Sequence, residues 1–166
     1  MRRTVVGVMG GSLGDERTLA QAHELGRRIA EAGWVLLSGG RASGVMQASV
    51  TGAREAGGLT VGVLFDTDRN AAAEGLDIVI PTGMGSARNA INVLASDVVV
   101  ACRGRGGTLS EVALALRAGR PVVLLDFNPG ATFLDTCGHD ARWSLAADPA
   151  AAVEAVRTYL ETAGRA

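Results

Sequence analysis

Residues 97–126 read DVVVACRGRGGTLSEVALALRAGRPVVLLD, and they contain the clearest structural pattern in the chain. Its two ends are short apolar runs, which predict strands over 97–102 and 121–126. The apolar spacing between them predicts a helix over 108–118, which Gly119 would end. A strand without a polar face is typical of a parallel sheet that helices cover on both sides. The stretch therefore predicts a strand–helix–strand unit of an α/β protein.

The same alternation of short apolar runs and longer helical patterns extends over the rest of the chain. Further strands are expected over 4–9, 34–38, 60–65 and 77–80. Further helices are expected over 15–32, 44–57, 86–95 and 149–163, with Gly33 and Gly57 as left-handed helix ends. Surface loops are expected over 66–76 and 127–141. We predict a single-domain α/β fold over residues 1–166, a Rossmann-like three-layer sandwich with a central parallel sheet of about six or seven strands and helices on both faces.

The composition excludes two kinds of chemistry. All 16 basic residues are arginine, because the chain contains no lysine. Pyridoxal phosphate needs a lysine amine for its Schiff base, and a Walker A loop needs the lysine of its pattern, so neither is present. A net charge of −1 and a pI near 6.1 give no basic surface for nucleic acid. We therefore expect no nucleic-acid partner.

Cysteine spacing and hydropathy predict a cytoplasmic protein. Cys102 and Cys137 lack the C-x-x-C spacing of redox and zinc motifs, so both are expected to be reduced thiols. Cys137, His139 and Asp140 lie close together in the sequence, but mixed donors in a loop of this kind are not expected to bind a metal. The chain has no run of 18 apolar residues, so we expect no membrane span.

The candidate site residues lie where the predicted strands end. In open α/β sheets, ligands bind beyond the carboxyl ends of the strands, where helix N-termini present free N–H groups. Asp77 and Asp97 stand at the opposite ends of their strands, and we expect structural roles for them. The segments at the ligand-binding edge are 10–14, 38–44, 81–88, 102–108 and 126–130.

Glycine-rich turns follow the first two predicted strands. Their candidate ligand-binding residues are Gly10, Gly11 and Ser12 in the first turn and Gly39, Gly40 and Arg41 in the second. The backbone of such a turn can approach a phosphate closely, but a tight turn in which Ser12 caps a helix explains the first one equally well. Arg41 is expected either to reach a bound anion or to be solvated. Met46, just beyond, is expected in the core.

Gly83 and Arg88 belong to the third segment, PTGMGSARN at 81–89, in which Ser86 is expected to cap a helix. A cation in the first helical turn opposes the helix macrodipole at a cost of about 0.3 to 1 kcal/mol. Arg88 is therefore expected to have an anionic partner. That partner is either a ligand phosphate, held bidentately, or a neighbouring carboxylate.

The fourth segment, CRGRGGTLSE at 102–111, is the most specific string in the chain. Its candidate binding residues are Arg103, Gly104, Arg105, Gly106, Gly107 and Thr108. Glycine N–H groups at a helix start can form an anion-binding nest, which the helix dipole reinforces. A local explanation competes with this one, because Thr108 and Glu111 have the spacing of a capping box. A capping box does not explain the two arginines.

Four motifs in these segments resemble those of a known superfamily. They are GGS-x-G at 10–14, SGG-x-x-x-GVM at 38–46, GMGSARN at 83–89 and GGTLSE at 106–111. Over about residues 4–126 the chain resembles the LOG-like Rossmann superfamily, whose members are often misnamed lysine decarboxylases. Within it, the chain is most similar to the branch of molybdenum cofactor carrier proteins. The absence of lysine excludes the decarboxylase activity.

The resemblance implies alternative functions. The carrier branch implies binding, without chemical change, of a phosphorylated nucleotide-like or pterin ligand, such as the molybdenum cofactor or a nucleotide. The cytokinin-activating branch implies a phosphoribohydrolase that cleaves the N-glycosidic bond of a nucleoside 5′-monophosphate, with Arg88 and Glu111 as catalytic pair. A DNA-interacting module is a third alternative. The resemblance also implies a homo-oligomer, either a dimer or a tetramer.

The match to the hydrolase motif P-G-G-x-G-T-x-x-E is incomplete. Arg103 replaces its proline, Arg105 replaces a glycine, and Asn89 stands where the hydrolases usually carry lysine. The positions that agree are Gly104, Gly107, Thr108 and Glu111, and Arg88 falls where the upstream arginine is expected. A more cationic loop can hold phosphate or pyrophosphate, but it does not favour the tight base pocket of a hydrolase.

Overall fold

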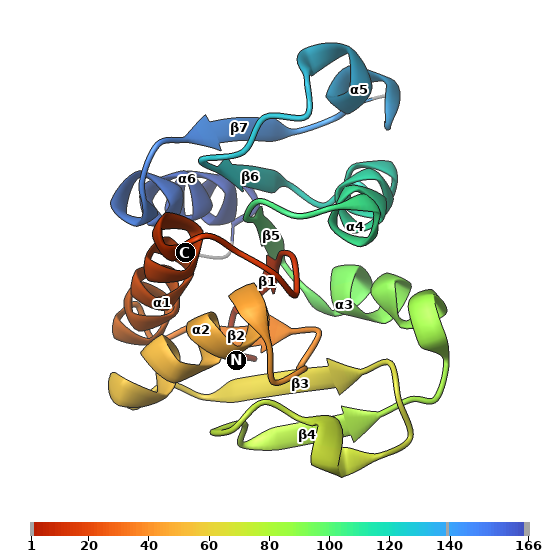
Figure 1. The fold of residues 1–166 in the computed structure, drawn as a ribbon. Coiled ribbons are helices and arrows are strands. Elements are labelled where there is room, and N and C mark those ends of the chain that lie inside the picture. The colour runs from red at the N-terminus through yellow and green to blue at the C-terminus, as the bar shows by residue number, and fades with distance from the viewer. Residues whose placement is uncertain (1, 139, 165–166) are drawn as a thin grey trace.

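The computed structural model describes residues 2–138 and 140–164, and seven strands form one sheet within these ranges (Figure 1). The strand order is β4-β3-β2-β1-β5-β6-β7, and every neighbouring pair is parallel. The strands are β1 (Val5–Met9), β2 (Val35–Ser38), β3 (Thr60–Leu64), β4 (Ile78–Pro81), β5 (Val98–Ala101), β6 (Val122–Leu125) and β7 (Trp143–Ala146). The six strands expected from the sequence are confirmed, and so is their parallel arrangement.

Helices cover both faces of the sheet and complete three layers (Figure 1). They are α1 (Glu16–Glu31), α2 (Gly44–Glu55), α3 (Asn89–Ala95), α4 (Gly106–Arg117), α5 (Ala131–Thr136) and α6 (Pro149–Thr162), with 3₁₀ turns η1 (Arg69–Ala71) and η2 (Gly85–Arg88). Val6 and Val8 of β1 pack with α1, α2 and α6, whereas Met9 packs with α3, α4 and α5. Side chains alternate along a strand, so β1 contributes to two separate cores. The predicted Rossmann-like three-layer fold is confirmed.

The C-terminal part of the sheet contains elements that the sequence did not predict. β7 is an edge strand that pairs with β6, and its sequence, WSLA, leaves Leu145 exposed. It therefore lacks the continuous apolar run that identifies the central strands. α5 lies within the expected loop 127–141, and its six residues are too few to show a helical period.

Three helix starts differ from those predicted. Asp15 caps α1 by accepting a hydrogen bond from the Thr18 N–H at 2.8 Å, so the expectation that Ser12 is this cap is wrong. Ser86 lies inside η2 and caps no helix. α4 begins at Gly106, earlier than the predicted 108. The predicted helix ends are confirmed by left-handed φ angles of 75°, 72° and 70° at Gly33, Gly57 and Gly119.

Asp77 and Asp97 have structural roles, as expected. Asp97 accepts hydrogen bonds from the Arg2 guanidinium and the Val5 N–H, and Asp77 accepts from the Thr60 N–H and hydroxyl. Cys102 and Cys137 are free thiols. His139 lies outside the described residues. The prediction that Cys137, His139 and Asp140 bind no metal therefore stays a prediction.

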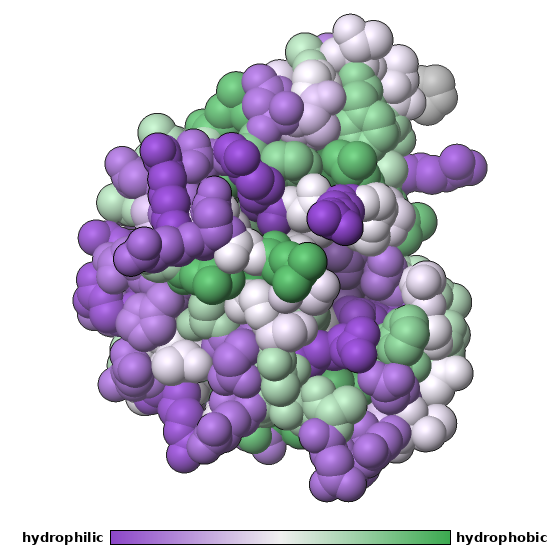
Figure 2. Space-filling model, viewed as in Figure 1, coloured by the Kyte–Doolittle hydropathy of each residue, from purple (hydrophilic) through white to green (hydrophobic). Residues whose placement is uncertain are grey.

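The surface in Figure 2 is mainly hydrophilic, and its hydrophobic residues form small separate patches. None of the helices in the described part of the chain is both long and apolar enough to cross a membrane.

Candidate functional site

The carboxyl ends of β1 and β5 lie side by side in the middle of the sheet. The chain leaves β1 for α1 on one face of the sheet and leaves β5 for α4 on the opposite face. Connections that diverge in this way leave a crevice, which α/β proteins use to bind ligands. A cavity of about 230 Å³ lies at this position, and we call it the switch-point pocket.

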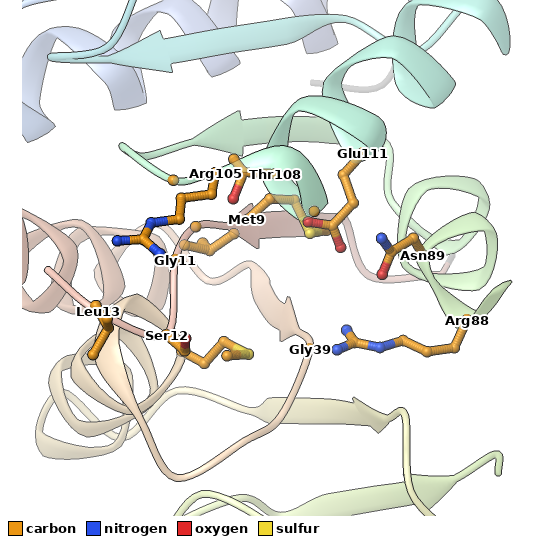
Figure 3. Close-up of a pocket in the computed structure, with 15 residues that line it drawn as sticks. Met9, Gly11, Ser12, Leu13, Gly39, Arg88, Asn89, Arg105, Thr108 and Glu111 are labelled. Carbon is orange, nitrogen blue, oxygen red and sulfur yellow. The ribbon is translucent and has the colours of Figure 1, made fainter. Parts of the chain in front are cut away.

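The switch-point pocket is lined by residues from four of the segments singled out in the sequence (Figure 3). The predicted site residues among them are Gly10, Gly11, Ser12, Gly39, Arg88, Gly104, Arg105, Gly107, Thr108 and Glu111. The others are Val8, Met9, Leu13, Met46 and Asn89. Residues as far apart in the sequence as Val8 and Glu111 thus surround one cavity.

The other candidates lie outside the pocket lining. Gly40 and Gly83 have positive φ angles, and Gly40 packs against the backbone of Gly62, where an added Cβ would lie 2.8 Å from Cα. Arg41 lies over the Phe65 ring, 5.3 Å from its centroid, with its Nε atom 3.9 Å from Asp66 Oδ2. Arg103 lines a neighbouring pocket, described below. Gly106 begins α4 and faces open space.

Arg88 is the central cation of the switch-point pocket. Its side chain extends from η2 against Gly39, where an added Cβ would lie within 2.3 Å of its Nη1 atom (Figure 3). Only 8% of Arg88 is exposed, and its Nε is buried without a hydrogen-bond partner among the described residues. Burial lowers the pKa of Arg88, and the charges of Glu111 and Asp66 offset part of this effect. A guanidinium nevertheless stays protonated in proteins.

No carboxylate forms an ion pair with Arg88 within the described part of the chain. Of the two partners expected from the sequence, the neighbouring carboxylate is therefore not in place. A buried charge without a partner is unfavourable, so this position suits a ligand that brings an anion.

Glu111 faces the same pocket from α4. It is 6% exposed and accepts a hydrogen bond at 3.0 Å from the side-chain amide of Asn92, a completely buried residue of α3. Burial raises the pKa of Glu111, and the Asn92 hydrogen bond and the Arg88 charge oppose this shift. Asn89, also from α3, donates to the Ser110 hydroxyl at 3.0 Å.

The capping-box interpretation of Thr108 and Glu111 is wrong. Arg105 is the N-cap residue of α4, and no side chain caps this helix. Glu111 therefore lies beyond the first turn, where its carboxylate turns towards Asn92 instead of back to the helix start. Thr108 is buried beneath Gly104, where an added Cβ would lie within 1.9 Å of the threonine hydroxyl.

The glycine-rich loops after β1 and β5 hold each other in place. The Gly11 N–H donates to the Arg103 carbonyl at 3.2 Å, and an added Cβ at Gly104 would lie 3.0 Å from the Gly11 nitrogen. Gly107, in contrast, has no atom within 4 Å of such a Cβ. The first N–H groups of a helix have no partner within it, so the start of α4 offers free donors at an open surface.

Sequence reasoning missed the apolar lining of the pocket. Met46 is buried, as expected, but it also lines the pocket. Leu13 is 74% exposed, and its place in the glycine-rich turn at 10–14 is the feature of the sequence that indicates a position near the ligand. Val8 and Met9 belong to the strand itself and gave no signal at all.

Comparison with known proteins gives the family. The model of the SLOG cluster4 family matches residues 3–153. The chain belongs to this family. This SLOG cluster4 protein is 42% identical, over 125 residues, to an uncharacterized protein of Archaeoglobus fulgidus, covering 75% of this chain and 82% of that one.

Two solved structures share both fold and sequence with this SLOG cluster4 protein. The molybdenum cofactor binding protein of the phototrophic bacterium Rippkaea orientalis matches with a TM-score of 0.88 and 43% identity, over 96% of this chain and 99% of that chain. The molybdenum cofactor carrier protein of Chlamydomonas reinhardtii matches with a TM-score of 0.87 and 45% identity, over the same shares. The resemblance to the LOG-like superfamily and its carrier branch is confirmed.

Replacing Glu111 with glutamine is expected to stabilise this SLOG cluster4 protein at neutral pH. Because the pKa of Glu111 is raised by folding, the native state binds its proton more tightly than the unfolded chain does. At pH values above the ordinary glutamate pKa of about 4.3, the ionised Glu111 carboxylate therefore lowers the free energy of unfolding. Below that pH the carboxyl is protonated in both states, and this effect disappears. A pKa that folding raises by one unit corresponds to a cost of about 1.4 kcal/mol, which the glutamine variant does not incur.

Urea unfolding of wild type and Glu111→Gln across this pH range tests that prediction. The gain in the free energy of unfolding should appear as the pH rises above the ordinary glutamate range and vanish below it. Glu161→Gln, an exposed change at the end of α6, is the matched control. A gain that does not depend on pH would contradict the assignment to the buried carboxylate.

Proposed function

We propose that this protein binds the molybdenum cofactor, or a closely related phosphorylated pterin, in the switch-point pocket and carries it without chemical change. The observation that carries the proposal is Arg88, a buried guanidinium that lines a cavity without an ion pair from a described residue. The likeness to two proteins described as binding or carrying the molybdenum cofactor supports the choice of ligand.

The phosphate of such a ligand has two sets of donors in the pocket. Arg88 offers a planar guanidinium, which can hold a phosphate bidentately. Gly107 and Thr108 line the same cavity at the start of α4, where free N–H groups and the helix dipole favour an anion. Each charge-assisted hydrogen bond contributes about 1.5 to 3 kcal/mol.

The ring system of a pterin has apolar neighbours in the pocket. Met9, Leu13 and Met46 line it, and methionine side chains adapt to the faces of planar rings. Glu111 supplies a carboxylate and Asn89 an amide on one side of the cavity (Figure 3). The residues therefore fit a phosphorylated heterocycle, with a cation for the phosphate and polar groups for the ring edge.

The copurifying ligand tests the proposal. The protein would be expressed in cells that make the cofactor, denatured in air, and examined for released pterin by fluorescence and mass spectrometry. Wild type is expected to release a phosphorylated pterin. Arg88→Met is expected to release at least about tenfold less pterin, because the loss of one charge-assisted contact weakens binding by about that factor or more. Equal yields from the two proteins, or no pterin from wild type, would contradict the proposal.

Hydrolysis of a nucleoside 5′-monophosphate is the second candidate function, because Arg88 and Glu111 line the same pocket. A carboxylate can stabilise an oxocarbenium-like transition state and position water. Against it stands Arg105, which brings a cation into the lining where the hydrolase motif has glycine. Chromatography of AMP incubated with the protein decides between the functions: adenine release that Glu111→Ala abolishes would favour the enzyme.

A further inference from the structure

A second pocket adjoins the switch-point pocket, and we call it the outer pocket. It is lined by Leu13, Gly14, Asp15, Thr18, Arg103, Gly104 and Arg105. Leu13, Gly104 and Arg105 line both cavities. Because the two cavities share three wall residues, they adjoin each other, and an elongated molecule that passes Leu13 and Arg105 would contact the walls of both.

The two pockets have cations at opposite ends. Figure 3 shows Arg88, Asn89 and Glu111 at one end of the switch-point pocket and Arg105 and Leu13 at the other. Arg103 extends the positive charge into the outer pocket. Both Arg103 and Arg105 are exposed, and neither side chain forms a hydrogen bond or ion pair with another described residue.

One carboxylate on the wall of the outer pocket offsets part of this charge. Asp15 lines the pocket and caps α1 by accepting the Thr18 N–H at 2.8 Å, and hydrogen bonds from Thr18 together with the Arg103 charge lower the pKa of its carboxyl. Arg17, next along α1, forms an ion pair with Asp126 at 2.9 Å. Two guanidinium groups and one carboxylate remain on the pocket wall, so its net charge is positive.

We infer that the cleft takes an elongated ligand with two anionic groups joined by an uncharged stretch, one bound at Arg88 and the other at Arg103 and Arg105. This inference rests on the proposed function and adds to it the class of ligand, a bis-anion. Leu13 lines both cavities, and its exposed apolar side chain is available to contact the uncharged stretch. Binding both anions in one molecule raises the affinity because the second contact becomes intramolecular.

A series of α,ω-alkylene bisphosphonates with increasing spacer length tests this inference, with propylphosphonate as the single-anion reference. Titration calorimetry at one ionic strength gives each affinity. For wild type, at least one spacer length is expected to bind about tenfold more tightly than propylphosphonate, or better. Arg103→Ala is expected to remove most of this advantage, whereas Arg117→Ala, an exposed change at the far end of α4, should retain it.

The outcomes separate the inference from the proposed function. If no bisphosphonate exceeds propylphosphonate by more than about threefold, or if Arg103→Ala keeps the full advantage, the two-anion cleft is wrong. The proposed function fails on a different result, namely copurification of equal amounts of pterin with wild type and Arg88→Met. Arg103→Lys keeps the charge and is expected to restore part of the advantage, which excludes simple misfolding of the loop.

Discussion

Arg88→Met is expected to abolish the stabilisation of this protein by phosphate-type anions and, at the same time, to stabilise the ligand-free chain. Without a ligand, the buried guanidinium has no ion pair from a described residue, and methionine fills a similar volume without a charge. Burying a charge without a hydrogen-bond partner costs stability, and this cost exceeds the attraction between Arg88 and Glu111, so the substitution is expected to stabilise the ligand-free chain by about 1 to 2 kcal/mol. With a phosphate-type ligand bound, wild type is expected to be more stable than Arg88→Met.

Thermal unfolding with and without pyrophosphate measures both effects. A ligand at a hundred times its Kd stabilises the native state by about 2.7 kcal/mol, which corresponds to a rise in Tm of several degrees for a domain of this size. Wild type should show this rise and Arg88→Met should not. Arg117→Met, an exposed substitution of the same kind, should behave as wild type. A variant Arg88→Met that is less stable without ligand, or that retains the rise, contradicts our account.

Gly39→Ala is expected to disrupt the pocket by displacing Arg88. The added Cβ would lie 2.3 Å from Arg88 Nη1 and 2.9 Å from Met46 Sδ, so both side chains have to move, and the guanidinium has to move furthest. Overpacking of this kind costs about 1 to 3 kcal/mol of stability. Because the guanidinium is displaced, anion-dependent stabilisation should also be lost.

A double-mutant cycle distinguishes this mechanism from a general defect in the β2 turn. In an Arg88→Ala background the Nη1 atom is gone, so Gly39→Ala should cost less stability there than in wild type by about 0.5 kcal/mol or more. If the cost is the same in both backgrounds, Gly39 does not act through Arg88.

The central strands and helix ends could be predicted because each has a strong local signal. Val98–Ala101 is fully buried and apolar throughout, and Gly33 and Gly119 have the left-handed conformation that ends a helix. β7 could not be predicted from an apolar run, because an edge strand is covered on fewer sides and tolerates Ser144 and an exposed Leu145. Its pairing with β6 depends on tertiary contacts.

The site was predictable as a set of loops but not as a set of contacts. The rule that ligands bind beyond strand ends selected the segments, whereas the adjacency of β1 and β5 depends on the order of strands in the sheet. The spacing of Thr108 and Glu111 fits a capping box, but the extended backbone of Arg105 starts α4 earlier and turns Glu111 to Asn92. Leu13 and Met46 are apolar residues whose role depends on the cavity beside them.

A crystal structure of the protein with its copurified ligand would show which group neutralises the buried guanidinium of Arg88. We predict the ligand in the switch-point pocket, with phosphate oxygens within hydrogen-bond distance of the Arg88 guanidinium and of the N–H groups at the start of α4. A ligand bound elsewhere, with Arg88 still buried and in contact only with protein atoms, would contradict our account.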